Sequence, residues 1–200
     1  MTRDPRVING ADGDPPTNGT IPARARIGTA MDSTTGHLLI APPNMGDPNF
    51  DGTVVYIVDH DEAGALGVVI NRPTETPVAL LIPELSEHVV EPDVFFEGGP
   101  VGSDQVLGIG LTGGRLEIVD LEAVISGALR PESLRLFAGY TGWAAGQLDG
   151  ELAISAWIVS EATHDDVMGL ERDSVWRRVL RRQGGAVGRL ALYPDLLMLN

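Results

Sequence analysis

The feature of this sequence that most constrains its fold is a pair of apolar segments separated by a short turn. Residues 53–58 (TVVYIV) are mostly β-branched or aromatic, and residues 65–71 (ALGVVIN) follow the turn at 61–64 (DEAG). Such side chains favour strands, and a short Gly-containing turn between two strands is typical of a β-hairpin. Since the second arm is almost entirely apolar, we expect it to be buried on both faces of a sheet.

Other segments add strands and helices to this hairpin. Pro77 is suited to the first position (N1) of a short helix, and Asp120 is suited to cap another. Because hairpins come early and β–α–β spacing comes late, we expect an α/β (α+β mixed) fold with a mixed sheet. The predicted strands lie at 37–41, 93–97, 105–109, 115–118, 134–140 and 153–159, and the predicted helices at 78–82, 121–127, 142–152 and from a cap at Asp173 or Ser174 to Gly184.

The first 26 residues differ in composition from the rest of the chain. Residues 9–20 (NGADGDPPTNGT) are polar and rich in Gly and Pro, without a hydrophobic period. Such a segment cannot bury enough apolar surface to offset the entropy lost on ordering. We therefore expect a disordered N-terminal tail at 1–26 and a single folded domain at 27–200.

The ionisable composition excludes several kinds of chemistry. All 14 basic residues are Arg, the chain has no Cys, and the formal net charge is −14. The missing Cys excludes disulfides, catalytic thiols, iron–sulfur clusters and thiolate zinc sites, and the missing Lys excludes a Schiff base and a P-loop. The acidic charge disfavours nucleic acid as a partner. Since no apolar run reaches about 18 residues and no signal peptide is evident, we expect no membrane partner and a cytoplasmic location.

The loop at 42–50 and the end of the hairpin carry five candidate ligand-binding side chains. Asn44, Asp47 and Asn49 belong to the Pro-rich loop, so they could bind a small polar ligand or cap turns through Asx hydrogen bonds. Asn71 and Arg72 follow the second arm, and Arg72 is the one basic residue among 13 acidic residues between positions 32 and 104. Arg72 is therefore either a structural ion-pair partner or a contact for an anion.

Two further motifs add four candidate ligand-binding residues. Gly98 and Gly99 allow close approach of the backbone, which could form an anion-binding nest or pack against another strand. Trp143 and Gln147 are spaced i, i+4, so the predicted helix at 142–152 places them on one face. They could be a core residue with its hydrogen-bonding neighbour, or one wall of a ligand site.

Two acidic clusters contain His, at 59–62 (DHDE) and 164–166 (HDD). Neither has the spacing of an HExxH helix or an EF-hand loop. In a strand, Asp59 and Asp61 share one face while His60 points to the other. We interpret both clusters as solvated turns and expect no metal site and no cofactor.

The C-terminal helix combines an apolar stripe with a basic face. Residues 172–189 hold six Arg and one acidic residue. This face could contact phosphate or an acidic partner, or it could pair with the protein's own acidic surface. The stripe is Val175, Trp176, Val179 and Leu180, and the basic face, a candidate partner-binding surface, is Arg177, Arg178, Arg181 and Arg182.

Three ordered motifs resemble the AlgH/YqgE-like family of small bacterial proteins. They are GHLLIAPPNMGDPNF at 36–50 with GALGVVINRP at 64–73, FEGGPV at 96–101, and GYTGWAAGQL at 139–148 with Ala156-Trp157. The resemblance implies mixed β-sheets bent into a pseudo-barrel flanked by helices, and a cytosolic location. The family is named after a presumed regulator of alginate production and has no established biochemical activity, so no catalytic residue is carried over. Where relatives often have Cys-Glu-His, this chain has Val58-Asp59-His60, which excludes a thiol-based role.

Three functional hypotheses follow from the sequence. The first is a non-enzymatic cytosolic binding or regulatory module with a protein or small-molecule partner. The second is an enzyme or small-molecule binder whose pocket is formed by loop 42–50, Arg72, Gly98-Gly99 and Gln147. The third is a nucleic-acid-linked regulator that uses the C-terminal Arg helix.

Overall fold

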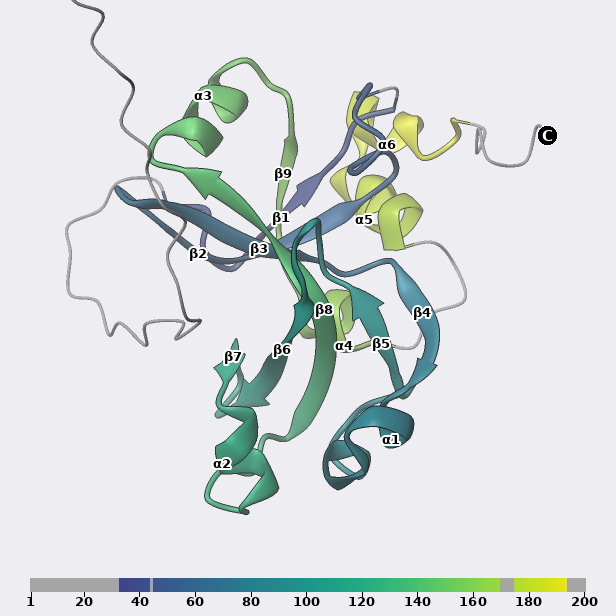
Figure 1. Ribbon diagram of the computed structural model, residues 1–200. Coiled ribbons are helices and arrows are strands. Elements are labelled where there is room, and N and C mark those ends of the chain that lie inside the picture. Colours follow the sequence, from purple (N-terminus) through teal and green to yellow (C-terminus); the bar gives the residue numbers. More distant parts are fainter. Residues whose placement is uncertain (1–32, 44, 170–174, 194–200) are drawn as a thin grey trace, which may run out of the picture. The chain divides into compact units, whose positions relative to one another are not determined.

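The computed structural model describes residues 33–43, 45–169 and 175–193. The predicted tail at 1–26, Asn44 and the predicted cap at Asp173 or Ser174 lie outside the described residues. In chain order (Figure 1) the elements are β1 (His37–Ile40), β2 (Val54–Asp61), β3 (Gly64–Val69), β4 (Pro73–Pro77), α1 (Val78–Leu81), η1 (Pro83–Leu85), β5 (Val94–Glu97), β6 (Val101–Thr112), β7 (Arg115–Val119), α2 (Leu121–Ile125), β8 (Ser133–Ala144), α3 (Gln147–Ala153), β9 (Ile158–Glu161), α4 (His164–Met168), α5 (Val175–Gln183) and α6 (Gly185–Leu190).

Nine strands of the described residues form one mixed sheet in the order β4-β5-β8-β3-β2-β1-β9, with β7 joined through β6 to β8. The β5–β8 pair is parallel, and the other pairs are antiparallel. The long strand β8 joins two parts of the sheet, because its first half pairs with β5 and β6 and its last residues pair with β3. The predicted mixed α/β class is confirmed. The sheet is not closed into a barrel, since β4, β7 and β9 each pair on one side only.

The predicted β-hairpin is confirmed as β2 and β3, with Tyr56 opposite Val68 and Val55 opposite Val69. The alternation of side chains sends Val68 to one face of the sheet and Val69 to the other. The two belong to different core clusters, and both are almost fully buried. The second arm is therefore buried on both faces, as its apolar sequence predicts.

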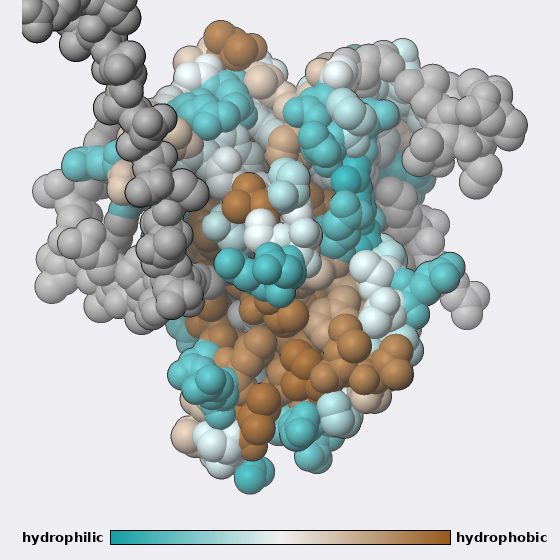
Figure 2. Space-filling view, in the orientation of Figure 1, coloured by the Kyte–Doolittle hydropathy of each residue, from teal (hydrophilic) through white to brown (hydrophobic). Residues whose placement is uncertain are grey.

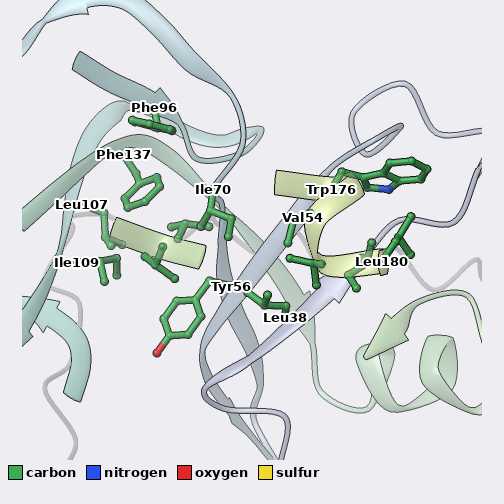
Figure 3. Close-up of a cluster of buried hydrophobic side chains, with 14 of the residues drawn as sticks. Leu38, Val54, Tyr56, Ile70, Phe96, Leu107, Ile109, Phe137, Trp176 and Leu180 are labelled. Atoms are coloured by element: carbon green, nitrogen blue, oxygen red, sulfur yellow. The ribbon is translucent and has the colours of Figure 1, made fainter. Parts of the chain in front are cut away.

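The first core cluster lies between the sheet and helices α4 and α5, since Val167 of α4 also belongs to it (Figure 3). Trp176, Val179 and Leu180 of α5 pack with side chains of β1 and β2, such as Leu38 and Val54. The indole of Trp176 also donates a hydrogen bond of 2.8 Å to the carbonyl of Ala41. The predicted apolar stripe of the C-terminal helix is thus confirmed, and Gly184 follows its last residue.

Two other clusters lie on other surfaces of the sheet. The second cluster brings Phe50 of the loop together with Trp143, Trp157 and Leu148. The third cluster lies where α1, η1 and α2 cover β5 and β8; its buried residues are Val78, Leu85, Phe95, Val119, Val124, Leu134 and Leu136. Asp120 caps α2 as predicted, because its carboxylate accepts from the backbone N–H groups of Glu122 and Ala123.

Several predicted elements are wrong in extent or type. The segment 142–144 belongs to β8 and pairs with β3, so the predicted helix at 142–152 is replaced by α3, which begins at Gln147. The strand predicted at 153–159 is confined to β9, which begins at Ile158. Pro77 is the N-cap residue of α1 and not its first residue. Strand β4, which the sequence analysis did not predict, contains two Pro residues and forms an edge of the sheet, where missing N–H donors are tolerated.

Candidate functional site

The loop at 42–50 is held by its own turn and by an aromatic anchor. The carboxylate of Asp47 accepts from the backbone N–H of Asn49 at 2.9 Å, and its carbonyl accepts from the N–H groups of Phe50 and Asp51. Phe50 stacks on Trp143, with ring centroids 6.5 Å apart. Asp47 therefore acts as an Asx-turn residue. Beside it lies an open hollow of about 330 Å³ lined by Gly46, Asp47, Pro48 and Asp51.

Asn71 and Arg72 connect the hairpin to this loop. The side chain of Asn71 accepts from the N–H of Val54 at 2.9 Å and donates to the carbonyl of Gly52 at 2.8 Å. The guanidinium of Arg72 donates to the carbonyl of Pro48 at 3.4 Å. Loop 45–50, Asn71 and Arg72 are therefore neighbours, but the amide of Asn71 is occupied by backbone groups.

Gly98 and Gly99 lie against strand β8. The N–H of Gly98 donates to the carbonyl of Ala138 at 2.8 Å. A Cβ atom at Gly98 would collide with the carbonyl of Gly139, and one at Gly99 with the carbonyl of Tyr140. Close packing of two strands therefore accounts for both glycines. They do not line the hollow at the loop.

Trp143 and Gln147 meet at a carboxylate that the sequence analysis did not single out. The indole N–H groups of Trp143 and Trp157 donate to the same oxygen of Glu151, at 2.9 and 2.7 Å. The amide of Gln147 donates to the other oxygen at 3.0 Å and accepts from the N–H of Ala144. Trp143 and Gln147 are neighbours, as their spacing predicts. Trp143, however, lies on β8 and does not share a helix face with Gln147. The i, i+4 spacing of Gln147 and Glu151 was a signal in the sequence for this cluster.

Helix α5 directs most of its predicted basic face toward other parts of the chain. Arg178 and Arg182 both contact the carboxylate of Asp166, at 3.2 and 2.8 Å, and Asp166 is almost fully buried. Arg177 donates to the carbonyls of Ala191 and Tyr193. Arg181 is exposed.

The electrostatics of Asp166 follow from these contacts. Burial by itself raises the pKa of this carboxyl, but hydrogen bonds from Thr163 and the guanidinium of Arg182 outweigh burial, so its pKa is lower than the ordinary value of 3.8. The same carboxylate completes a capping box with Thr163 at the start of α4. Arg178 and Arg182 thus fasten α5 to α4.

Arg135 is a second buried charge that the sequence analysis did not identify. Its guanidinium lies 4.4 Å above the ring of Phe96 and donates to the carbonyls of Glu91 and Met168 at 2.9 and 3.2 Å. Desolvation by burial lowers the pKa of Arg135 to about 10. Arg135 joins β8 to the segment before β5 and to the end of α4.

His60 points inward, whereas Asp59 is exposed on the neighbouring position of β2. Its Nδ1 atom lies 2.9 Å from the hydroxyl of Thr34, and its Nε2 atom lies 3.6 Å from the carboxylate of Asp149. No group of three or more His, Cys, Asp or Glu residues that could hold a metal ion occurs within residues 33–43, 45–169 and 175–193. Within the same ranges, no helix is long and apolar enough to cross a membrane.

The predicted site residues therefore form three separate groups in the structure. Asp47 lies near Arg72, Trp143 lies near Gln147, and the two glycines pack on β8. Of the predicted pocket, the loop residues Gly46, Asp47 and Pro48 line the hollow, and Arg72, Gly98, Gly99 and Gln147 do not. A single pocket formed by all of them stays a prediction.

Comparisons with known proteins identify the family. The chain is 42% identical over 191 residues to a UPF0301 protein of Streptomyces avermitilis, covering 86% of this chain and 98% of that one. It is 39% identical to a UPF0301 protein of Mycobacterium tuberculosis, over 82% of this chain and 90% of that one.

Two solved structures are also similar. The crystal structure of protein DIP2367 from Corynebacterium diphtheriae matches with a TM-score of 0.74 and 29% identity, covering 86% of this chain and 96% of that one. The solution structure of the AlgH protein from Pseudomonas aeruginosa matches with a TM-score of 0.63 and 30% identity, covering 85% and 99%. Since the AlgH-like family model also matches residues 38–188, the chain belongs to the AlgH-like family.

Proposed function

We propose that this protein is a cytoplasmic, non-enzymatic binding module that takes a protein partner on the surface of α1 and α2. The observation that carries the proposal is the exposure of Leu80 and Leu81, which are 71% and 63% exposed on consecutive positions of α1. Ile125 of α2 is 46% exposed, and α2 contacts η1, the element after α1. Contiguous apolar surface on a protein marks interaction sites more often than isolated apolar residues do.

The apolar surface extends beyond these three side chains. Figure 2 shows brown side chains gathered in the lower half of the view, where Figure 1 draws α1, β5, β8 and α2. Partly buried Ile82, Leu121 and Leu129 pack on the third core cluster in the same region. The surface thus has an apolar centre supported by a packed core.

The other predicted sites offer fewer groups for a partner. The polar side chains of Asp47, Asn71 and Gln147 bind groups of the chain itself. Arg178 and Arg182 hold Asp166, so a nucleic-acid ligand would compete with a buried carboxylate for them. A regulatory role would act through the protein partner.

The small-molecule alternative is favoured by one observation, the hollow lined by Gly46, Asp47, Pro48 and Asp51. An amide chemical-shift titration separates it from the nucleic-acid alternative. A short single-stranded oligonucleotide and then phosphorylated metabolites are added to the labelled protein. Shifts confined to loop 45–51 and Arg72 would support a small-molecule site, and shifts confined to α5 would support nucleic-acid binding. We expect neither.

Photo-crosslinking in cells tests the proposed surface. A photoreactive amino acid is placed at Leu81 in one variant and at Ile154 in a control variant. Ile154 is also strongly exposed, at 78%, but it follows α3, which Figure 1 draws at the opposite end of the view from α1. We expect a discrete protein adduct from position 81 alone. Equal adducts from both positions, or no adduct from position 81, would contradict the proposal.

A further inference from the structure

We propose that the partner segment is a basic amphipathic helix, which lays its apolar face on Leu80, Leu81 and Ile125 and its Lys or Arg residues against an acidic rim. This inference rests on the proposed function, because it names the partner of the same surface. It is carried by the exposed acidic residues of the two segments that contain these side chains, which are a separate observation from the exposed leucines.

The apolar centre has the character that a helical peptide requires. Amphipathic helices bind through apolar side chains at i, i+3 or i+4 and i+7 on one face. Helix α1 buries Val78 in the third core cluster, and Leu80 and Leu81 of the same turn stay exposed. Their exposed fractions leave most of each side chain available to a partner.

The acidic rim comes from the two segments that carry this centre. Segments 73–97 and 120–132 contain nine Asp or Glu residues and a single Arg. All nine acidic residues are exposed, and none forms an ion pair within the described parts of the chain. They are Glu75, Glu84, Glu87, Glu91, Asp93, Glu97, Asp120, Glu122 and Glu132.

This charge selects among the possible occupants of the surface. A second copy of the chain would bring the same acidic rim and a net charge of −14, and an anionic membrane would also be repelled. A cationic helix gains attraction from the rim and burial from the centre. The acidic surface and the apolar centre together therefore fit a basic partner helix.

The test uses a designed peptide as the probe. The peptide has about 14 residues, or about four helical turns, with leucines on one face and lysines on the other. We expect it to bind the full chain with a Kd in the micromolar range and to shift amide signals of α1, η1 and α2. A peptide with glutamates in place of the lysines should not bind. A lysine peptide of the same composition, with its leucines scattered around the helix, should bind at least tenfold more weakly.

Variants of the protein separate the two parts of the surface. Leu80→Ser with Leu81→Ser should weaken binding by tenfold or more, because apolar contacts at the centre of an interface carry most of its affinity. Glu84→Gln with Glu87→Gln should weaken binding severalfold and reduce its dependence on salt, because exposed charges are screened. Ile154→Ser is the matched control and should leave binding unchanged. Circular dichroism checks that each variant is folded.

The outcomes distinguish this inference from the proposed function. Equal binding of the lysine and glutamate peptides, or shifts outside α1, η1 and α2, would overturn the basic helix. The basic helix would also be overturned if the lysine peptide failed to bind while position 81 still crosslinked. In that case the proposed surface would stand, with a partner of other chemistry. Failure of both experiments would overturn the surface itself.

Discussion

Helices α5 and α1 both lie against the sheet, but they differ in how much of their leucine side chains is exposed. Leu180 of α5 is fully buried, whereas Leu80 of α1 is 71% exposed. Helix α5 has nine residues, so it can bury an apolar stripe and still direct Arg178 and Arg182 to Asp166 on α4. Helix α1 has four residues and buries Val78, whereas its two leucines stay exposed. Helix α5, with its paired charges, covers one face of the sheet, whereas the single turn of α1 leaves apolar side chains exposed on the other.

The largest expected effect comes from the ion pairs that hold α5. Asp166→Ala removes the carboxylate shared by Arg178 and Arg182 and the cap of α4, so we expect the free energy of unfolding to fall by about 4 kcal/mol. Denaturant unfolding measures it. The control is Asp165→Asn on the same helix, an exposed position that should change the free energy by less than about 0.5 kcal/mol. A loss below about 1 kcal/mol for Asp166→Ala would show that these charges do not fasten α5.

A leucine pair tests the comparison directly. Leu180→Ala leaves a cavity in the first cluster and should reduce the free energy of unfolding by about 3 kcal/mol, whereas Leu80→Ala should cost less than about 0.5 kcal/mol. Both are measured by denaturant unfolding at several protein concentrations. A large loss at Leu80 that grows with concentration would mean that this residue is covered by another copy in solution, which would remove the difference between the two helices.

The carboxylate between the tryptophans should have an intermediate effect. Glu151→Ala leaves the buried indole N–H groups of Trp143 and Trp157 without their acceptor, so we expect a loss of about 2 kcal/mol and a change in tryptophan fluorescence. Glu151→Gln keeps one acceptor and should lose about half as much. If the glutamine variant were as unstable as the alanine variant, the charge of Glu151, and not its hydrogen bonds, would be responsible.

The smallest expected effect is a dependence of the free energy of unfolding on pH. Because the pKa of Asp166 is lower in the folded state than its ordinary value of 3.8, its contribution to stability is complete above that value and is lost as the pH falls through the folded value. Unfolding of the natural chain and of Asp166→Asn is compared between about pH 2 and 6. The difference in stability between the two should shrink toward low pH. A difference that stays constant with pH would show that protonation of Asp166 does not contribute.

The hairpin and the C-terminal helix could be predicted because their signals are local. The runs at 53–58 and 65–71 contain the strand-forming residues and the turn between them, and the stripe of α5 needs only its own period. The predicted helix at 142–152 failed because Trp143 pairs with Ala65 of β3, a partner far away in the sequence. Strand pairing of this kind overrides a local helical pattern.

The candidate site was predictable to a smaller degree for the same reason. Trp143 and Gln147 do lie together, but the carboxylate of Glu151 joins Trp143 to Trp157 only after the chain has turned through α3. Arg178 and Arg182 appeared as one basic face, yet their partner Asp166 lies on another helix. The spacing of Gln147 and Glu151 within α3 was a local signal, but partners on separate elements, such as Trp157 for Glu151 and Asp166 for Arg182, leave no period or spacing to detect.

The sequence by itself determined the mixed α/β class, the central hairpin, the amphipathic C-terminal helix and membership of the AlgH-like family. These depend on patterns within short segments and on motifs in order. Only the tertiary structure decided that Arg135 and Asp166 are buried charges with partners and that Leu80 and Leu81 remain exposed. Burial depends on which elements cover a residue, and that is set by contacts between segments far apart in the chain.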